Sequence, residues 1–144
     1  MSNASKVTRQ LRERLECIRP DNGYSIELKA IYFRHEKVPE NPPKPYAMVR
    51  VVSDRRTSTA GFEATRLRTL AIEIVFAGRT DDDEVDRAGV DVLRALGFGR
   101  VDLEDKLPGL VDDEDEAEFT YPDGGLTTRS IITSIGVTYV ENYN

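Results

Sequence analysis

The stretch from Arg66 to Leu96, RLRTLAIEIVFAGRTDDDEVDRAGVDVLRAL, changes its hydrophobic period half-way along. In its first half apolar residues recur at every second position, which places them on one face of a β-strand, at Leu70, Ile72, Ile74 and Phe76. In its second half the spacing becomes three and four residues, as on one side of an α-helix, at Val85, Ala88, Gly89, Val92, Leu93 and Leu96. The stretch therefore predicts a long strand that passes through an acidic turn into a helix.

The rest of the chain predicts one more helix and three more strands around this unit. A first helix is expected to begin at an N-cap residue, Ser5, and to carry an apolar stripe at Val7, Leu11, Leu15 and Ile18. Alternating segments predict strands over residues 24–33, 46–53 and 127–140, with a further short strand at 119–121 as an open alternative. The expected fold is α+β, a mainly antiparallel four-stranded sheet with two helices packed on one face. The long connection between the third strand and the last would also allow a parallel crossover and hence a mixed sheet.

Three connections are long and polar. Residues 34–45 contain four prolines, which predicts an extended arm that is either a stiff loop or a contact with a neighbouring subunit. Residues 54–65 are expected to form a mobile connection, in which Phe62 either packs on its own core, the favoured alternative, or anchors in another chain. Residues 112–118, DDEDEAE, are expected to form a solvated loop.

Size and composition are those of an ordinary globular domain. The chain has 144 residues, 39% of them hydrophobic and 32% charged, and no apolar run long enough to span a bilayer. Residues 1–4 are interpreted as a cloning scar, and residues 5–144 as one domain. Cys17 is the only cysteine, so an intrachain disulfide and a thiolate zinc site are excluded. We expect a soluble intracellular protein with no membrane partner.

Charge is distributed unevenly along the chain, whose formal net charge is −6. The segment from Lys6 to Arg19 has five basic residues and two acidic ones, whereas the segment from Asp102 to Asp123 has ten acidic residues and one lysine. Such asymmetry suits copies of the chain that meet head to tail, the basic end of one against the acidic loop of the next. Two unrelated solvated surfaces are an equally good interpretation. The negative charge also opposes nonspecific binding to nucleic acid.

Catalytic and metal-binding patterns are weak. Four acids, Asp81 to Glu84, could bind magnesium or calcium, but their position before a predicted helix favours capping of its first turn. The only histidine, His35, has no partner pattern for catalysis and is expected to be a solvated surface residue. No P-loop, dinucleotide-binding, hydrolase-elbow, zinc-protease or nucleic-acid-binding motif occurs. We therefore expect a protein that is not an enzyme and has no cofactor or metal site.

The order and texture of the elements resemble those of bacteriophage tail terminator proteins, also called tail completion or minor tail proteins. The resemblance covers residues 5–140 and is carried by the start LRERLECIRPDNGY, the centre TLAIEIVFAGRTDDDEVDRAGVDVLRAL and the end SIITSIGVTYVE. It implies a structural viral protein that assembles as a ring, usually a homohexamer, on the last ring of tail-tube subunits. Such a ring ends tube polymerisation and binds the head connector protein, while genomic DNA passes through the lumen without sequence-specific binding.

The resemblance also implies where contacts with other subunits would lie and where the protein would act. The family has no catalytic residues to transfer, and its ring contacts use loops and strand edges. In this chain these point to a subunit or tube interface at Arg34, His35, Lys37, Pro42, Pro43, Arg55, Arg56, Phe62, Asp113, Glu114 and Asp115. The expected location is the head-proximal end of the virion tail, and the host cytoplasm during assembly. The alternatives are another head–tail joining or tail-tube protein, a small monomeric adaptor, and a hydrolase that binds metal through Asp81 to Glu84.

Overall fold

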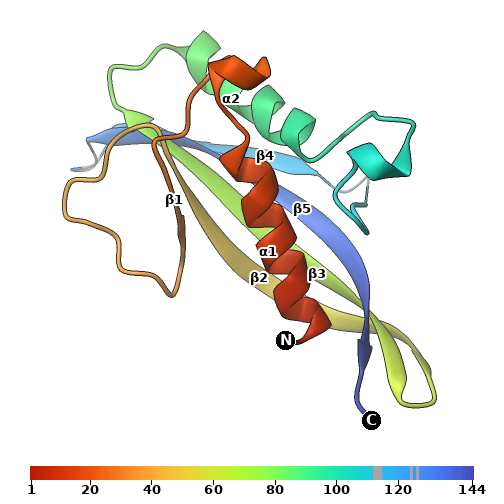
Figure 1. The fold of residues 1–144 in the computed structure, drawn as a ribbon. Helices are drawn as coiled ribbons and strands as arrows, with labels where there is room; N and C mark the ends of the chain where they lie inside the picture. The colour runs from red at the N-terminus through yellow and green to blue at the C-terminus, as the bar shows by residue number, and fades with distance from the viewer. Residues whose placement is uncertain (112–114, 124, 126) are drawn as a thin grey trace.

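The predicted long strand is β3, Glu63–Ala77, which lies at the centre of a five-stranded sheet (Figure 1). The computed structural model describes residues 1–111, 115–123, 125 and 127–144. The strand order is β1-β2-β3-β5-β4. The other strands are β1, Ala30–Phe33; β2, Tyr46–Ala60; β4, Glu116–Thr120; and β5, Thr128–Asn142. β3 is antiparallel to β2 from Glu63 to Val75 and to β5 along its whole length, so three 15-residue strands form the central part of the sheet.

Both helices cover the same face of this sheet (Figure 1). They are α1, Asn3–Glu16, and α2, Asp82–Ala95, and short 3₁₀ helices follow at Pro20–Asn22 and Leu103–Asp105. Leu11 of α1 and Val92 of α2 join Ile72 of β3 in one apolar core in which all three side chains are fully buried. Burial of each such side chain stabilises the fold by about 1.5–3 kcal/mol. The prediction of an α+β fold with two helices on one face is confirmed.

The prediction of four mainly antiparallel strands is only partly right. A fifth strand, β4, pairs antiparallel with β5 and overlaps the predicted short strand at 119–121. The sheet is mixed because β1 pairs parallel with β2, through the proline-rich connection 34–45. The crossover considered between the third and last strands does not occur, since β3 and β5 are adjacent and antiparallel.

The first predicted strand, 24–33, is mostly irregular. Ile26 is 5% exposed and packs in the core, yet only Ala30–Phe33 has a strand neighbour. The carboxylate of Asp91 on α2 accepts hydrogen bonds from the backbone N–H groups of Ser25 and Ile26, both at 2.9 Å. The segment is therefore held by a side chain of α2, and its alternation reflects burial without a strand ladder.

The first helix begins earlier than predicted. Its N-cap is Ser2, whose hydroxyl accepts from the backbone N–H of Ser5 at 3.1 Å. The expected cap, Ser5, lies inside the helix, because the carboxylate of Glu141 accepts hydrogen bonds from the backbone N–H groups of Asn3 and Ala4 and so stabilises an earlier first turn. Asn3 and Ala4, interpreted from the sequence as part of a cloning scar, form the first turn of α1.

Candidate functional site

The β2–β3 hairpin extends beyond the helices and carries an exposed tip. Figure 1 shows its turn beyond the N-terminal end of α1, next to the C-terminal end of β5. The strands pair as far as Ala60 and Glu63, and Gly61 has a φ of 63°. A positive φ at the first of two loop positions is the pattern of a type II′ turn, for which glycine is favoured. The prediction of a mobile connection over residues 54–65 is therefore wrong, because nearly all of it is in paired strands.

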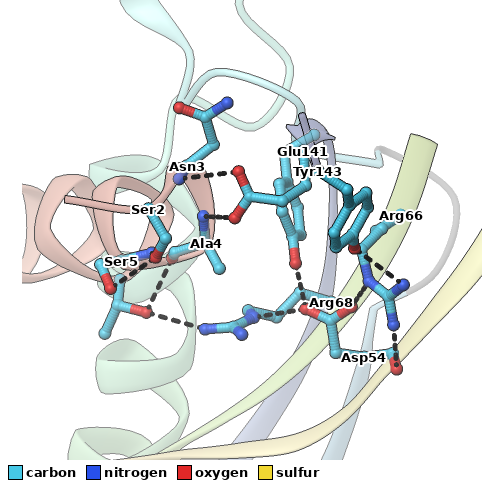
Figure 2. A network of polar contacts seen from close by, with 11 residues as sticks. Ser2, Asn3, Ala4, Ser5, Asp54, Arg66, Arg68, Glu141 and Tyr143 are labelled. Carbon is cyan, nitrogen blue, oxygen red and sulfur yellow. Dashed lines mark hydrogen bonds and ion pairs between the residues drawn. The ribbon is translucent and has the colours of Figure 1, made fainter. Parts of the chain in front are cut away.

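A partly buried ionic cluster fixes the base of this hairpin (Figure 2). The carboxylate of Asp54 on β2 accepts hydrogen bonds from the guanidinium groups of Arg66 and Arg68 on β3, the latter at 2.8 Å. It also accepts from the hydroxyl of Tyr139 on β5. Arg68 in turn donates to Thr8 of α1 at 3.2 Å. The cluster thus joins three strands and the first helix where the hairpin leaves the core.

The electrostatics of the cluster favour a charged Asp54 and a neutral Tyr139. Burial acts to raise the pKa of Asp54, but the hydrogen bonds from Tyr139, Arg66 and Arg68 outweigh it, so its pKa lies below the ordinary value. Burial and the hydrogen bond to Asp54 raise the pKa of Tyr139 to about 12. A proton donor with such a high pKa and a carboxylate held by two cations are poor general acid–base groups at neutral pH. We interpret the cluster as structural.

A second polar contact anchors the start of α1 to the end of β5 (Figure 2). The carboxylate of Glu141 accepts from the backbone N–H groups of Asn3 at 3.1 Å and Ala4 at 3.3 Å. The side-chain amide of Asn3 donates to the carbonyl of Val140 at 2.8 Å. Because helix N-termini have unpaired N–H groups and a positive dipole end, this carboxylate stabilises the first turn. Together with the Asp54 cluster it holds α1, β2, β3 and β5 in one rigid arrangement.

A basic groove lies between α1 and the outer edge of β2. It has a volume of about 820 Å³ and is bordered by Arg9 and Arg12 on α1, by Arg34 and His35 after β1, by Arg50 on β2 and by Arg68 on β3. Among the described residues that line it, Glu36 is the only acidic one. Arg12 is paired with Glu36 and Arg68 with Asp54, whereas no ion pair of Arg34 or Arg50 occurs within the described part of the chain. The groove therefore has excess positive charge facing solvent.

The opposite edge of the sheet is acidic. It is formed by β4, in which the first four residues are exposed. Glu116 and Glu118 on this strand, and Asp115 just before it, make no ion pair among the residues that the structure describes. Phe119 and Tyr121 add exposed aromatic surface, at 42% and 57% exposure. The strand order thus places basic and acidic groups that lack ion pairs among the described residues at the two opposite edges of one sheet.

The sheet face away from the helices is not covered by a second layer within the described residues. Along the central strands it includes small or partly buried side chains, such as Ala71 and Ser134. A shallow hollow of about 350 Å³ on this face is lined by Met48, Glu73 and Ile132 and bordered by the exposed Arg34 and Arg50. β5 has a neighbouring strand on each side, since it lies between β3 and β4.

The acidic turn before α2 caps the N-terminus of this helix. The side chain of Asp81 accepts from the backbone N–H of Glu84 at 2.8 Å, which confirms the capping interpretation. Asp82 pairs with the buried Arg129, and Asp83 pairs with Arg87, each at 2.8 Å. Within the part of the chain that the structure describes, no three histidine, cysteine, aspartate or glutamate residues are grouped so that they could hold a metal ion.

The residues predicted from the sequence to form an interface fall into four places. Arg34 and His35 border the basic groove. Arg55, Arg56 and Phe62 lie on the exposed hairpin, and the 69% exposure of Phe62 contradicts the favoured interpretation that it packs on its own core.

The remaining predicted residues divide between the arm and the acidic segment. In the arm, Lys37 and Pro43 are exposed, whereas Pro42 is buried in its own chain and cannot contact a partner. Asp115 is exposed beside β4, and Asp113 and Glu114 lie outside the described residues.

Several residues with structural or surface roles could not be recognised from the sequence. Asp54, Asp91 and Glu141 each bind groups that are distant in sequence, and no local pattern distinguishes them from other surface acids. Arg50 lies in a predicted strand, but the sequence does not show that it borders the groove. It does so because β1 ends at Phe33 and its pairing with β2 stops at Val49.

The comparisons with known proteins leave the function to be inferred from these surfaces. No protein-family model and no curated protein matches the chain. Among the described residues no helix combines the length and apolar character that a membrane span requires.

Proposed function

We propose that this chain is a structural protein of a bacteriophage tail, which assembles as a ring on the end of the tail tube. The ring would end polymerisation of the tube, bind the head connector protein with its other face, and let genomic DNA pass through its lumen. The number of subunits that the resemblance implies is six. In this proposal the chain performs no catalysis and requires no cofactor.

The observation that carries the proposal is the separation of charge across the sheet. Exposed basic groups without ion pairs border the β1–β2 edge, and exposed acidic groups without ion pairs occupy β4 at the other edge, both within the described residues. A surface that is complementary to a different surface of the same molecule favours a head-to-tail contact, and such contacts generate rings when the rotation closes.

The projecting hairpin supports contact with further subunits. Its tip exposes Phe62, and its base is fixed by the Asp54 cluster, so the hairpin is presented in a defined direction. A preorganised hairpin loses less conformational entropy on binding than a flexible loop does. The hairpin is therefore suited to reach the tail tube or an adjacent ring.

Electron microscopy of phage that lack this gene tests the proposal. We expect tails of uncontrolled length, or complete tails that are not joined to heads, and restoration of normal particles when the wild-type gene is supplied in trans. Normal tails joined to heads in the deletion strain would contradict the proposal. Negative-stain images of the purified protein with isolated tail tubes should show an additional ring at one end of the tube.

The alternatives predict different results. A tail-tube protein would be needed for tubes to form at all, so the deletion strain would have none. A monomeric adaptor would remain monomeric in native mass spectrometry at high concentration and would not bind tubes. A metal-dependent hydrolase is disfavoured because Asp81, Asp82 and Asp83 are occupied with helix capping and ion pairs.

A further inference from the structure

The outer edge of β2 is open beyond the end of β1. The parallel pairing of these strands stops at Phe33 and Val49, whereas β2 continues to Ala60. Beyond Val49 no strand of the described chain covers this edge, and Val51 and Val52 are 43% and 54% exposed. An open strand edge can bind an additional strand through backbone hydrogen bonds. Two bulges in β2 interrupt the edge, which favours a short partner strand over a long one.

The surroundings of this edge select for an acidic partner. The edge forms one wall of the basic groove, in which Arg34 and Arg50 are exposed and have no ion pair among the described residues. Within the described part of the chain, the ion pair of Arg9 on the opposite wall is a long contact of 4.0 Å with Glu13, and both side chains are more than half exposed. Pairs of this kind contribute little, so Arg9 is also available to a partner.

The same chain has a strand with the required properties. β4 has five residues and forms the far edge of the sheet, where β5 is its only strand neighbour among the described residues. Glu116 and Glu118 alternate along it and so point to one face, and Asp115 precedes them. The exposed Phe119 could cover the valines beside the groove.

We propose that the open edge of β2, within the basic groove, binds β4 of a second copy of this chain. The contact is heterologous: each copy uses its groove toward one neighbour and its β4 edge toward the other, so that the sheets of successive copies are joined edge to edge. The inference rests on the proposed function in requiring self-association, and it specifies which two surfaces meet. Charge complementarity determines the direction in which the copies join.

Paired charge reversals test this contact. One variant, R34E/R50E, makes the groove acidic, and the other, E116K/E118K, makes the β4 edge basic. All four side chains are exposed and have no ion pair within the described residues, so both variants should fold, as checked by circular dichroism and thermal unfolding. Matched controls with the same change of charge are R79E/R100E and D21K/E104K, at exposed positions that do not border the groove.

Sedimentation velocity over a range of concentrations, with and without isolated tail tubes, gives the readout. Each variant alone should associate on the order of a hundredfold more weakly than the wild type, because like charges then face each other across the contact. The controls should associate as the wild type does. A mixture of the two variants should recover association at a ratio of one to one, since each groove then meets an edge of opposite charge.

Several outcomes would overturn the inference. These are unchanged association of either variant, failure of the mixture to recover, or a wild type that stays monomeric under every condition. Loss of duplex DNA binding in R34E/R50E with unchanged self-association would instead assign the groove to nucleic acid. Rings that resist both reversals leave the tail-terminator proposal intact, whereas normal tails in the deletion strain refute that proposal without affecting this contact.

Discussion

Replacement of Asp54 by asparagine provides a sensitive test of the cluster at the base of the hairpin. The substitution keeps the size of the side chain and one carbonyl acceptor, but removes the negative charge between Arg66 and Arg68. Both guanidinium groups would then be held together without a counter-charge, because β-strand geometry fixes their positions on the same face of β3. We expect the folded state to lose stability while the core is unchanged.

The expected loss of stability follows from how deeply the charged side chains of the cluster are buried. The side chains of Asp54 and Arg68 are each 17% exposed and that of Arg66 is 25% exposed, so the cluster is neither fully buried nor at the surface. Exposed ion pairs contribute about 0–1 kcal/mol, and breaking a buried pair costs about 3–5 kcal/mol. We therefore expect D54N to lower the free energy of unfolding by about 2–3 kcal/mol. For a chain of this length the corresponding decrease in Tm is roughly 6–12 °C.

Urea unfolding followed by circular dichroism at low protein concentration is the appropriate assay, since self-association would add stability of its own. Asp86→Asn, which removes one exposed acid from α2, is the matched control and should unfold as the wild type does. The pKa of Asp54 is lower in the folded state than in the unfolded state, so its contribution is present above the unfolded pKa of about 3.9 and is lost as the pH falls through the lower folded value. The difference between wild type and D54N should therefore be constant near neutral pH and should shrink below about pH 4.

A loss smaller than about 0.5 kcal/mol, equal to that of the control, would refute this reasoning. It would mean that water molecules accept the hydrogen bonds of Arg66 and Arg68 as favourably as the carboxylate of Asp54 does. A difference between wild type and D54N that persists unchanged in acid would likewise show that the charge of Asp54 is not the cause.

Three further substitutions test other parts of the structure. Tyr139→Phe should remove one tyrosine that ionises only at about pH 12 in a spectrophotometric titration, and because its pKa is raised on folding, the stability gained from this hydroxyl should be complete below pH 10 and decline as the pH rises toward 12. A late-ionising tyrosine that persists in Y139F would contradict the assignment. Asp91→Ala should cost about 2–3 kcal/mol in urea unfolding, because the buried N–H groups of Ser25 and Ile26 lose their acceptor; a change within error would show that water replaces it. Phe62→Ser should leave the free energy of unfolding within about 0.5 kcal/mol of wild type but weaken binding to tail tubes in a co-sedimentation assay, and unfolding of the variant instead would assign this ring to the core.

The sequence predicts well those elements that touch the helix–sheet core. β3 and α2 were predicted almost to their ends. Every second residue of β3, and one residue in each turn of α2, faces the same apolar core, so the hydrophobic period is clear in both. The prediction fails where an element extends past the helices. Residues 54–65 have polar side chains on both faces, since both faces meet solvent there, so the alternation that identifies a half-buried strand is missing. Their hydroxyl and β-branched residues, such as Thr57 and Thr59, were the remaining signal.

Long-range contacts explain the other differences. The segment 24–28 alternates like a strand, but the side chain of Asp91 binds its backbone, and this contact joins residues far apart in the chain. β4 lies within an acidic segment whose charge indicates only solvent exposure, and its pairing with β5 depends on the whole fold. The sequence showed a basic segment over residues 6–19, but the exposed groove residues Arg34 and Arg50 lie outside it. The location of basic and acidic groups at opposite edges of the sheet follows from a strand order that local patterns do not encode.

The bond between Glu141 and the first turn of α1 has a consequence for biosynthesis. It connects residues 137 and 138 positions apart, so the first helix is made long before the carboxylate that completes it. Contacts of such high sequence separation form late, because a long loop must close before they can stabilise the fold. A nascent chain on the ribosome therefore cannot complete the contact of Asp54 with Tyr139 or the pairing of β3 with β5 until β5 has emerged. Prematurely terminated products would lack a complete sheet, and under the proposed function they would therefore be excluded from the ring.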